Sequence, residues 1–277
     1  MTNHILLVDC PDRKGLVHGI TGLLLEQDVN VTKNDEFVDP ISNHFFMRTE
    51  FIGDVDEGVI VEHLRSYLGQ PSNLRLNPSR KKKVVVLATK EHHCLGDLLI
   101  HNQFNDFNAD ILAVISNHKV LQSLVGSFGV PFHFISHEHQ DRKNHEKAVF
   151  KALEIYQPEY IVLAKYMRIL TPEFVRHFQH RIINIHHSFL PAFAGASPYR
   201  QAFKRGVKII GATAHFVTND LDEGPILLQD VIRVDHRFSV RDLSDAGRDV
   251  EKTVLSRALK LVFDDRVFIH GNKTVIF

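Results

Sequence analysis

The stretch Asn184-Ile185-His186-His187-Ser188-Phe189-Leu190-Pro191 follows an isoleucine-rich run that begins at Arg181. An apolar run of this length predicts a short buried strand over 181–186. Because side chains alternate along a strand, Asn184 and His186 share one face, about 6.5 Å apart. A carboxamide can donate to an oxygen that becomes negative, and an imidazole can hold or move a proton near pH 7. The pair could therefore act on one carbonyl group; the alternative is a hydrogen-bonded core histidine beside an Asn that ends a strand.

A second segment offers a carboxylate partner for this pair. After Gly211-Ala212-Thr213-Ala214, the chain reads HFVTNDLDEGP from His215 to Pro225, which predicts an apolar strand that opens into an acidic loop. Asp222 lies in that loop. The structural alternative is an ordinary turn, in which an Asp side chain accepts from nearby backbone N–H groups.

Around these segments, apolar runs alternate with helical periodicity. This alternation predicts an α/β domain with a Rossmann-like, mostly parallel sheet, whose reactive groups gather at the carboxyl ends of the strands, where His186 falls. The expected strands are 83–89, 109–116, 132–135, 160–164 and 181–186. The expected helices are 95–103, 119–128, 141–156 and 172–178, the last capped by Thr171.

The first part of the chain has a different order. Strands are expected at 3–9, 29–38, 44–52 and 73–76, and helices at 15–27 and 56–68. This is a ferredoxin-like βαββαβ order with a four-stranded sheet.

A break in composition separates the two parts. Prolines and small polar residues over 70–79 lead into Arg80-Lys81-Lys82-Lys83. We therefore expect one domain over 1–80 and a second over 83–277. No aromatic side chains are interleaved with the cations to stack bases, so we do not interpret them as an RNA contact. Near the end of the chain, 251–262 predicts a helix, and 267–270 and 273–277 predict a hairpin turned by Gly271-Asn272.

The composition of the chain argues against some classes of function. The 277 residues are 44% hydrophobic and carry no formal net charge, which favours a globular protein with a small-molecule ligand over one that binds nucleic acid or a membrane surface. Cys10 and Cys94 fall in different expected domains, which argues against a disulfide framework. The first residues show no secretory pattern, and no apolar run is long enough to span a membrane, so we expect a cytoplasmic protein.

Together, the Asn-x-His strand and the later His-x-Val-x-x-x-x-Asp-x-Gly-Pro pattern resemble the signature of the folate-dependent formyltransferase family. The resemblance covers Lys83 to about Val262 and includes Leu163-Ala164-Lys165-Tyr166-Met167-Arg168-Ile169-Leu170. The first domain resembles an ACT domain, with Asp12-Arg13-Lys14-Gly15-Leu16-Val17 at its first strand-to-helix turn. The whole chain is most similar to the branch of the family that uses water as the formyl acceptor.

This resemblance implies hydrolysis of 10-formyltetrahydrofolate to formate and tetrahydrofolate, which serves one-carbon and purine metabolism. The implied catalytic residues are Asn184, His186 and Asp222, and either His186 or Asp222 could take the proton from water. Folate is the substrate, no separate cofactor is required, and no metal is expected. The implied substrate-binding residues are Met167, Arg168, Ile169, Leu170, His215, Thr218 and Asn219.

Departures from two relatives favour water over an amine acceptor. The glycinamide ribonucleotide formyltransferases cradle a phosphate in a Gly-rich loop, whereas the equivalent stretch here, 89–97, contains Glu91 and a lone Gly96. The C-terminal domain with which methionyl-tRNA formyltransferase helps to hold tRNA is not expected here. An amine formyltransferase remains one alternative, and a non-catalytic amino-acid-binding regulator is another.

We do not expect a metal ion at either of the two histidine pairs in the sequence. Adjacent residues such as His92 and His93 rarely converge on one ion, and His137-Glu138-His139 has no third ligand at a recognisable spacing.

The ACT-like domain implies an amino-acid effector. Backbone N–H groups at the helix start near Asp12, Gly15 and Leu16 could stabilise a ligand carboxylate; the alternative is that Gly15 only permits the turn. Resemblance suggests methionine and glycine as effectors without deciding between them. It also suggests a homo-oligomer, because ACT-like modules usually pair.

Overall fold

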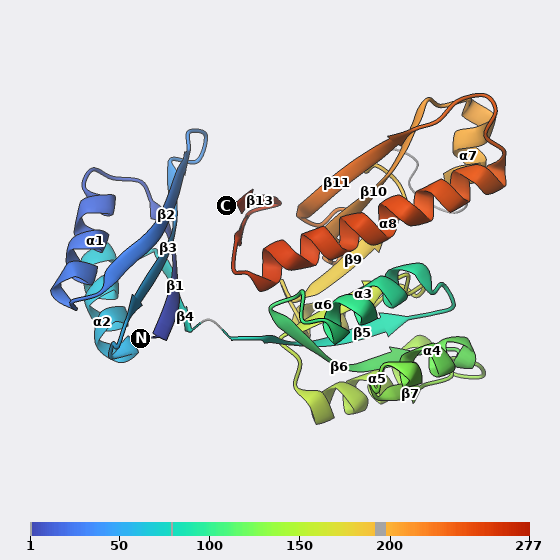
Figure 1. The fold of residues 1–277 in the computed structure, drawn as a ribbon, viewed down its shortest axis with the longest axis horizontal. Coiled ribbons are helices and arrows are strands. Elements are labelled where there is room, and N and C mark those ends of the chain that lie inside the picture. Colours follow the sequence, from blue (N-terminus) through green and yellow to red (C-terminus); the bar gives the residue numbers. More distant parts are fainter. Residues whose placement is uncertain (1, 79, 192–197) are drawn as a thin grey trace. The chain divides into compact units, whose positions relative to one another are not determined.

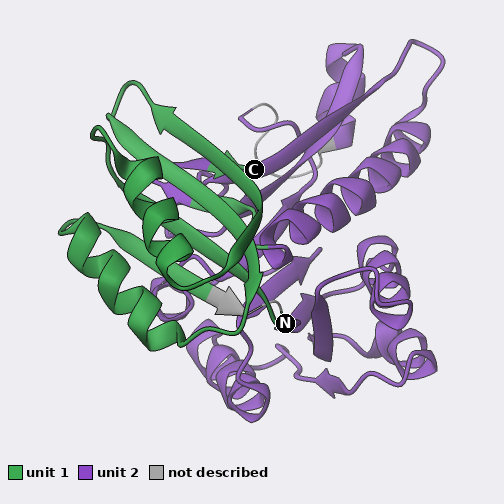
Figure 2. Ribbon diagram, turned by 60° about the vertical axis from the view of Figure 1, so that its left-hand side comes forward, with its two compact units in different colours: residues 1–80, 265–268, 275–277 green, residues 81–264, 269–274 purple. Residues whose placement is uncertain are grey.

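The computed structural model of the protein describes residues 2–78, 80–191 and 198–277. The chain divides into two compact units (Figure 2). Unit 1 contains residues 1–80, 265–268 and 275–277, and unit 2 contains residues 81–264 and 269–274. The C-terminal segment therefore contributes residues to both units.

Unit 1 is a four-stranded antiparallel sheet with strand order β2-β3-β1-β4. Two helices lie together on one face of this sheet (Figure 1). The elements are β1 (Thr2–Pro11), α1 (Leu16–Glu26), β2 (Asn30–Asp39), β3 (His44–Gly53), α2 (Glu57–Leu68) and β4 (Asn73–Pro78). The predicted βαββαβ order is confirmed.

Strand β1 is buried on both faces, which explains its continuous apolar sequence. Leu6 and Val8 pack in the core that includes α1 and α2. The alternate residues, Ile5 and Leu7, belong to a second cluster with Phe46 and Phe268. Residues from the end of the chain thus complete the second face of the unit 1 sheet.

Unit 2 is built on a seven-stranded sheet with order β11-β10-β9-β8-β5-β6-β7. Its strands are β5 (Lys82–Ala88), β6 (Ala109–Ser116), β7 (Phe132–Phe134), β8 (Tyr160–Ala164), β9 (Ile182–His186), β10 (Ile209–Phe216) and β11 (Ile226–Arg233). The strands from β5 to β9 pair in parallel, and β10 pairs antiparallel with β9 and β11. The predicted mostly parallel sheet is confirmed.

The helices of unit 2 connect and cover this sheet. They are α3 (His93–Gln103), η1 (Lys119–Leu121), α4 (Gln122–Ser127), α5 (Arg142–Tyr156), α6 (Pro172–His177), α7 (Pro198–Arg205) and α8 (Val240–Phe263). The Thr171 hydroxyl accepts from Phe174 N, so the predicted cap of α6 is confirmed. A two-stranded hairpin, β12 (Val267–His270) and β13 (Lys273–Ile276), closes the chain as predicted.

Helix α8 is longer than the predicted segment 251–262 and runs along β10 and β11 (Figure 1). It starts at a capping box, in which Ser239 Oγ accepts from Asp242 N and the Asp242 carboxylate accepts from Ser239 N. The sequence analysis overlooked this start signal. Among the described residues, no helix is both long and apolar enough to cross a membrane.

The strand order creates a topological switch point in unit 2. From β5, the chain proceeds to β6 and β7 on one side and later to β8 and β9 on the other. In open α/β sheets, ligands bind outside the carboxyl ends of the strands near such a point. The residues that follow β8 and β9 are therefore in position to form a site.

Candidate active site

A pocket of about 380 Å³ lies at the carboxyl ends of β8 and β9. Its lining comes from three segments that are distant in sequence, namely 163–170, 184–187 and 215–222. Asn184 lies directly opposite His215 in the antiparallel ladder of β9 and β10, which brings their side chains together. The pocket thus contains the three predicted catalytic residues, Asn184, His186 and Asp222.

His186 and Asp222 form a hydrogen-bonded pair in this pocket. His186 Nδ1 lies 3.2 Å from Asp222 Oδ1. The other ring nitrogen, Nε2, is buried and has no hydrogen-bond partner among the described residues. When Nδ1 carries the proton and donates a hydrogen bond to Asp222, Nε2 has a free lone pair that can accept a proton.

His215 orients Asn184 from the opposite strand. His215 Nδ1 lies 2.9 Å from the carbonyl oxygen of Phe216 and donates to it, because a carbonyl can only accept. In the neutral ring, Nε2 is then an acceptor for Asn184 Nδ2, which lies 3.2 Å away. Burial lowers the pKa of His215, which agrees with the neutral form. This arrangement uses one N–H of the Asn184 amide and leaves the second for a ligand.

The pKa shifts of Asp222 and His187 indicate the charge of each side chain at neutral pH. The hydrogen bond from His186 lowers the pKa of Asp222 against the opposing effect of burial, so the carboxylate is ionised at neutral pH. Burial, together with the Lys165 charge, lowers the pKa of His187 to about 4. His187, whose ring centroid lies 5.0 Å from that of His186, is therefore a neutral member of the pocket wall.

The loop that carries Asp222 is closed tightly at its base. Phe216 N donates to Pro225 O at 2.9 Å. Asp222 itself adopts a left-handed conformation with φ 59°. A Cβ on Gly224 would lie 1.8 Å from the Phe216 carbonyl oxygen, so only glycine fits there. The Gly-Pro ending of the loop thus fixes the position of Asp222.

The predicted substrate-binding residues divide into two groups. Met167, Arg168, Ile169, Leu170, His215 and Thr218 line the pocket. Met167 and Ile169 expose 63% and 52% of their surface, so apolar area is available to a flat ring system. Asn219 is exposed on the Asp222 loop and does not line the pocket.

The predicted regulatory residues lie at the start of α1 in unit 1. Gly15 is the N-cap residue and has φ 90°, a conformation that favours glycine. Leu16 is buried in the core, which leaves only its backbone for a ligand. The Asp12 backbone N–H donates to the Asn43 carbonyl at 2.8 Å.

Sequence analysis did not single out two further pocket residues, Lys165 and His187. Each carried a weak signal. Lys165 is a cation directly after the apolar strand β8, and His187 repeats the histidine of the Asn-x-His pattern.

Comparisons with known proteins agree with this architecture. Residues 82–259 match the formyl transferase family, and residues 4–69 match the ACT domain family. The solved structure of a formyltetrahydrofolate deformylase from Pseudomonas syringae has a TM-score of 0.96 and 41% identity, covering 100% of this chain and 95% of that one. A glycinamide ribonucleotide transformylase from Symbiobacterium toebii has a TM-score of 0.69 and 29% identity, covering 76% of this chain and 100% of that one.

Curated relatives extend the match along the whole chain. The formyltetrahydrofolate deformylase of Haemophilus influenzae is 54% identical over 98% of this chain and 98% of its own length. The deformylase of Bacillus subtilis is 43% identical over 98% of this chain and 93% of its own length. The chain therefore belongs to the formyltetrahydrofolate deformylase family, and in it an ACT domain precedes a formyl transferase domain.

Proposed function

We infer that this protein is a formyltetrahydrofolate deformylase, which hydrolyses 10-formyltetrahydrofolate to formate and tetrahydrofolate. The observation that carries this inference is the convergence of Asn184, His186 and Asp222 on one pocket in a chain that is 54% identical to a deformylase. The exposed apolar surface of Met167 and Ile169 suits the pterin ring of a folate. Folate is the substrate, and the proposed mechanism uses only side chains of the protein.

In the proposed mechanism, His186 Nε2 accepts the proton of the attacking water. Asp222 holds the opposite ring nitrogen at 3.2 Å and stabilises the imidazolium that forms. The water oxygen bonds to the formyl carbon, and the carbonyl oxygen becomes an oxyanion. Asn184 donates its remaining N–H to this oxyanion, a contribution worth about 3 to 4 kcal/mol of barrier. The bond from the carbon to N10 then breaks as His186 returns the proton to N10, and formate leaves.

The test is to incubate the protein with 10-formyltetrahydrofolate without any amine and to quantify formate and tetrahydrofolate. We expect both products in equal amounts. Asn184→Ala, His186→Ala and Asp222→Ala should each reduce kcat by about 100-fold or more while the fold, monitored by circular dichroism, is kept. Turnover that requires an added amine would instead identify an amine formyltransferase.

We also propose that unit 1 binds an amino acid at the start of α1 and regulates the hydrolysis. Support comes from the match of residues 4–69 to the ACT domain family and from Gly15, whose backbone turns the chain into α1. Methionine and glycine are the first ligands to test by calorimetry, with activity measured in parallel. A non-catalytic regulator would bind one of them without any folate turnover.

Two further properties complete the proposal. Cys10 and Cys94 are both free and buried, which suits the reducing environment of the cytoplasm.

A homo-oligomer is proposed because ACT-like modules usually pair, and light scattering of the purified chain tests it.

A further inference from the structure

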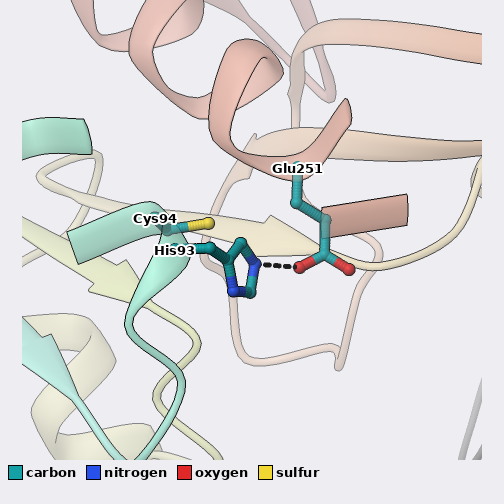
Figure 3. Close-up of side chains that lie close together, drawn as sticks. All are labelled: His93, Cys94 and Glu251. Carbon is teal, nitrogen blue, oxygen red and sulfur yellow. Dashed lines mark hydrogen bonds and ion pairs between the residues drawn. The ribbon is translucent and has the colours of Figure 1, made fainter. Parts of the chain in front are cut away.

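A buried polar cluster lies behind one wall of the pocket, centred on Glu251 of α8. Glu251 is only 1% exposed. Its Oε2 accepts from His93 Nε2 at 2.7 Å and lies 3.0 Å from Lys165 Nζ, and its Oε1 accepts from Tyr199 OH at 2.6 Å. Figure 3 shows the carboxylate reaching from α8 toward His93 and Cys94 at the start of α3.

The charges of this cluster are defined by its contacts. Burial alone would raise the pKa of Glu251, but the His93 hydrogen bond, the Lys165 charge and the Tyr199 hydrogen bond together lower it to about 2. Glu251 is therefore an anion paired with the ammonium of Lys165. A buried ion pair contributes little net stability because desolvation offsets the attraction, so a function is a better explanation for its presence than stability.

A metal site is a weaker interpretation of the same cluster. The ligand atoms of His93, Cys94 and Glu251 lie within 4.8 Å of one another. However, Glu251 Oε2 is already engaged by His93 and Lys165, and a lysine cation at 3.0 Å opposes a second cation. Burial raises the pKa of the Cys94 thiol well above its usual value, whereas metals bind the thiolate.

The position of Lys165 points instead to the reaction. The cluster consists of Glu251 and its three partners, His93, Lys165 and Tyr199. Of these four side chains, only Lys165 lines the pocket. Leu163 pairs with Asn184 in the parallel ladder of β8 and β9. Lys165, directly after β8, and His186, the last residue of β9, each follow their paired residue by two positions. Lys165 also has φ 58°, and such left-handed backbone at a non-glycine residue is concentrated at functional sites.

We propose that Lys165 is a specificity-determining residue, whose ammonium, fixed by Glu251, donates to the attacking nucleophile and selects water over amines. An ammonium has three N–H donors, and the contact with Glu251 uses one. A water oxygen has two lone pairs, so it can accept from Lys165 and attack the formyl carbon with the other. A neutral amine has a single lone pair, which the same hydrogen bond would occupy.

The inference rests on the hydrolysis proposed above and is tested by competition between two nucleophiles. The substrate is 10-formyltetrahydrofolate, and the added amine is trifluoroethylamine, a weakly basic amine whose nitrogen lone pair is its one good acceptor. Attack by water yields formate, whereas attack by the amine nitrogen forms a C–N bond and yields N-trifluoroethylformamide; both break the bond to N10 and release tetrahydrofolate. An enzyme-free sample corrects for the uncatalysed reaction.

For Lys165→Met without the amine, we expect kcat for formate release to fall by about 10-fold or more, with KM within about threefold of the parent value. With trifluoroethylamine, the ratio of N-trifluoroethylformamide to formate should rise by about 10-fold. A folded variant that keeps either the parental kcat or the parental product ratio overturns the proposal. Absence of formate from the parent chain would refute the proposed function instead.

Two further variants keep the test decisive. Lys165→Met leaves Glu251 buried without its cation, so Lys165→Met/Glu251→Gln, which removes both charges, is measured in the same way if the single variant does not fold. Lys82→Met is the matched control, because Lys82 is 5% exposed and begins β5, so it lies at the amino ends of the parallel strands, whereas the pocket lies at their carboxyl ends. A change in product ratio for Lys82→Met equal to that for Lys165→Met also overturns the proposal.

Discussion

At the scale of single residues, Asp222 determines which nitrogen of His186 is available for chemistry. The carboxylate can only accept, so the proton is on Nδ1 and the lone pair is on Nε2. Asp222→Asn introduces an amide that can donate to Nδ1 and so favours the opposite tautomer. We expect kcat to fall by about 10²- to 10⁴-fold, as in other histidines that lose an orienting carboxylate.

Steady-state kinetics of Asp222→Asn should be compared with those of Asp220→Asn. Asp220 is an exposed residue of the same loop and does not line the pocket. Equal activity of the two variants would show that the carboxylate of Asp222 does not orient His186.

His187 gives a prediction about pH and stability. Its pKa is lowered from 6.5 to about 4, mainly by burial. Between these values the unfolded chain binds a proton that the folded chain does not, so the free energy of unfolding decreases as the pH falls from about 6.5 to 4. The expected contribution is roughly 1 to 3 kcal/mol, after a discount for partial exposure.

His187→Gln should therefore weaken the pH dependence of stability in this window. Urea unfolding at several pH values measures the slope, and His236→Gln, at an exposed histidine, should leave it unchanged. A slope for His187→Gln equal to that of the parent would show that His187 is protonated equally in both states.

The sequence predicted the residues with the strongest local signals. Asn184 and His186 could be placed on one strand face because alternation is a local property, and Asp222 followed from the family pattern. The position of Lys165 could not be predicted, because it depends on Glu251 of α8, which lies 86 residues later in the chain. Such a pairing is set by tertiary packing, and no short-range pattern encodes it.

At the scale of elements, the loop between β10 and β11 explains the glycine of the Asp-x-Gly-Pro pattern. A Cβ on Gly224 would meet backbone, the Phe216 carbonyl oxygen at 1.8 Å, rather than a flexible side chain. Gly224→Ala should therefore shift the base of the loop and displace Asp222. We expect a loss of about 2 kcal/mol or more in the free energy of unfolding and a lower kcat.

Gly126→Ala is the matched control for this prediction. A Cβ on Gly126 in α4 would meet nothing within 4 Å, and alanine is favoured over glycine in a helix by about 1 kcal/mol. Chemical denaturation and kinetics should show a neutral or stabilised variant with parental turnover. Parental stability of Gly224→Ala would mean that the loop relaxes around the added carbon.

The sequence predicted the elements that have a clear apolar pattern. It missed elements whose residues are partly exposed or largely polar. Strands β5 and β8 are buried apolar runs, so their sequences identify them. Strand β11 was not predicted because its residues are partly exposed and mix polar with apolar side chains. Helix α7, eight residues long, was also missed, because its polar sequence carries few core positions.

At the scale of the whole molecule, the chain returns to its first unit at the end. Residues 265–268 and 275–277 belong to unit 1, together with residues 1–80 (Figure 2). The sequence predicted the hairpin at 267–277 from its turn and apolar runs. It could not predict the surface that the hairpin covers, because apolar residues do not specify their partners. A fragment of residues 1–80 alone would therefore leave the β1 face with Ile5 and Leu7 uncovered.

Phe268→Ala tests this completion of unit 1. Phe268 is 2% exposed, and its ring lies edge-on to that of Phe46 at 5.6 Å and to that of Phe277 at 5.7 Å. Truncation removes buried area and leaves a cavity, so the free energy of unfolding of the transition that includes unit 1 should fall by about 3 to 5 kcal/mol. Ile276→Ala, at a residue 38% exposed, is the control and should cost much less. Hydrogen exchange should show the largest loss of protection in β1 and β3, the strands that carry Ile5, Leu7 and Phe46. Unchanged protection there would mean that unit 1 is stable without the end of the chain.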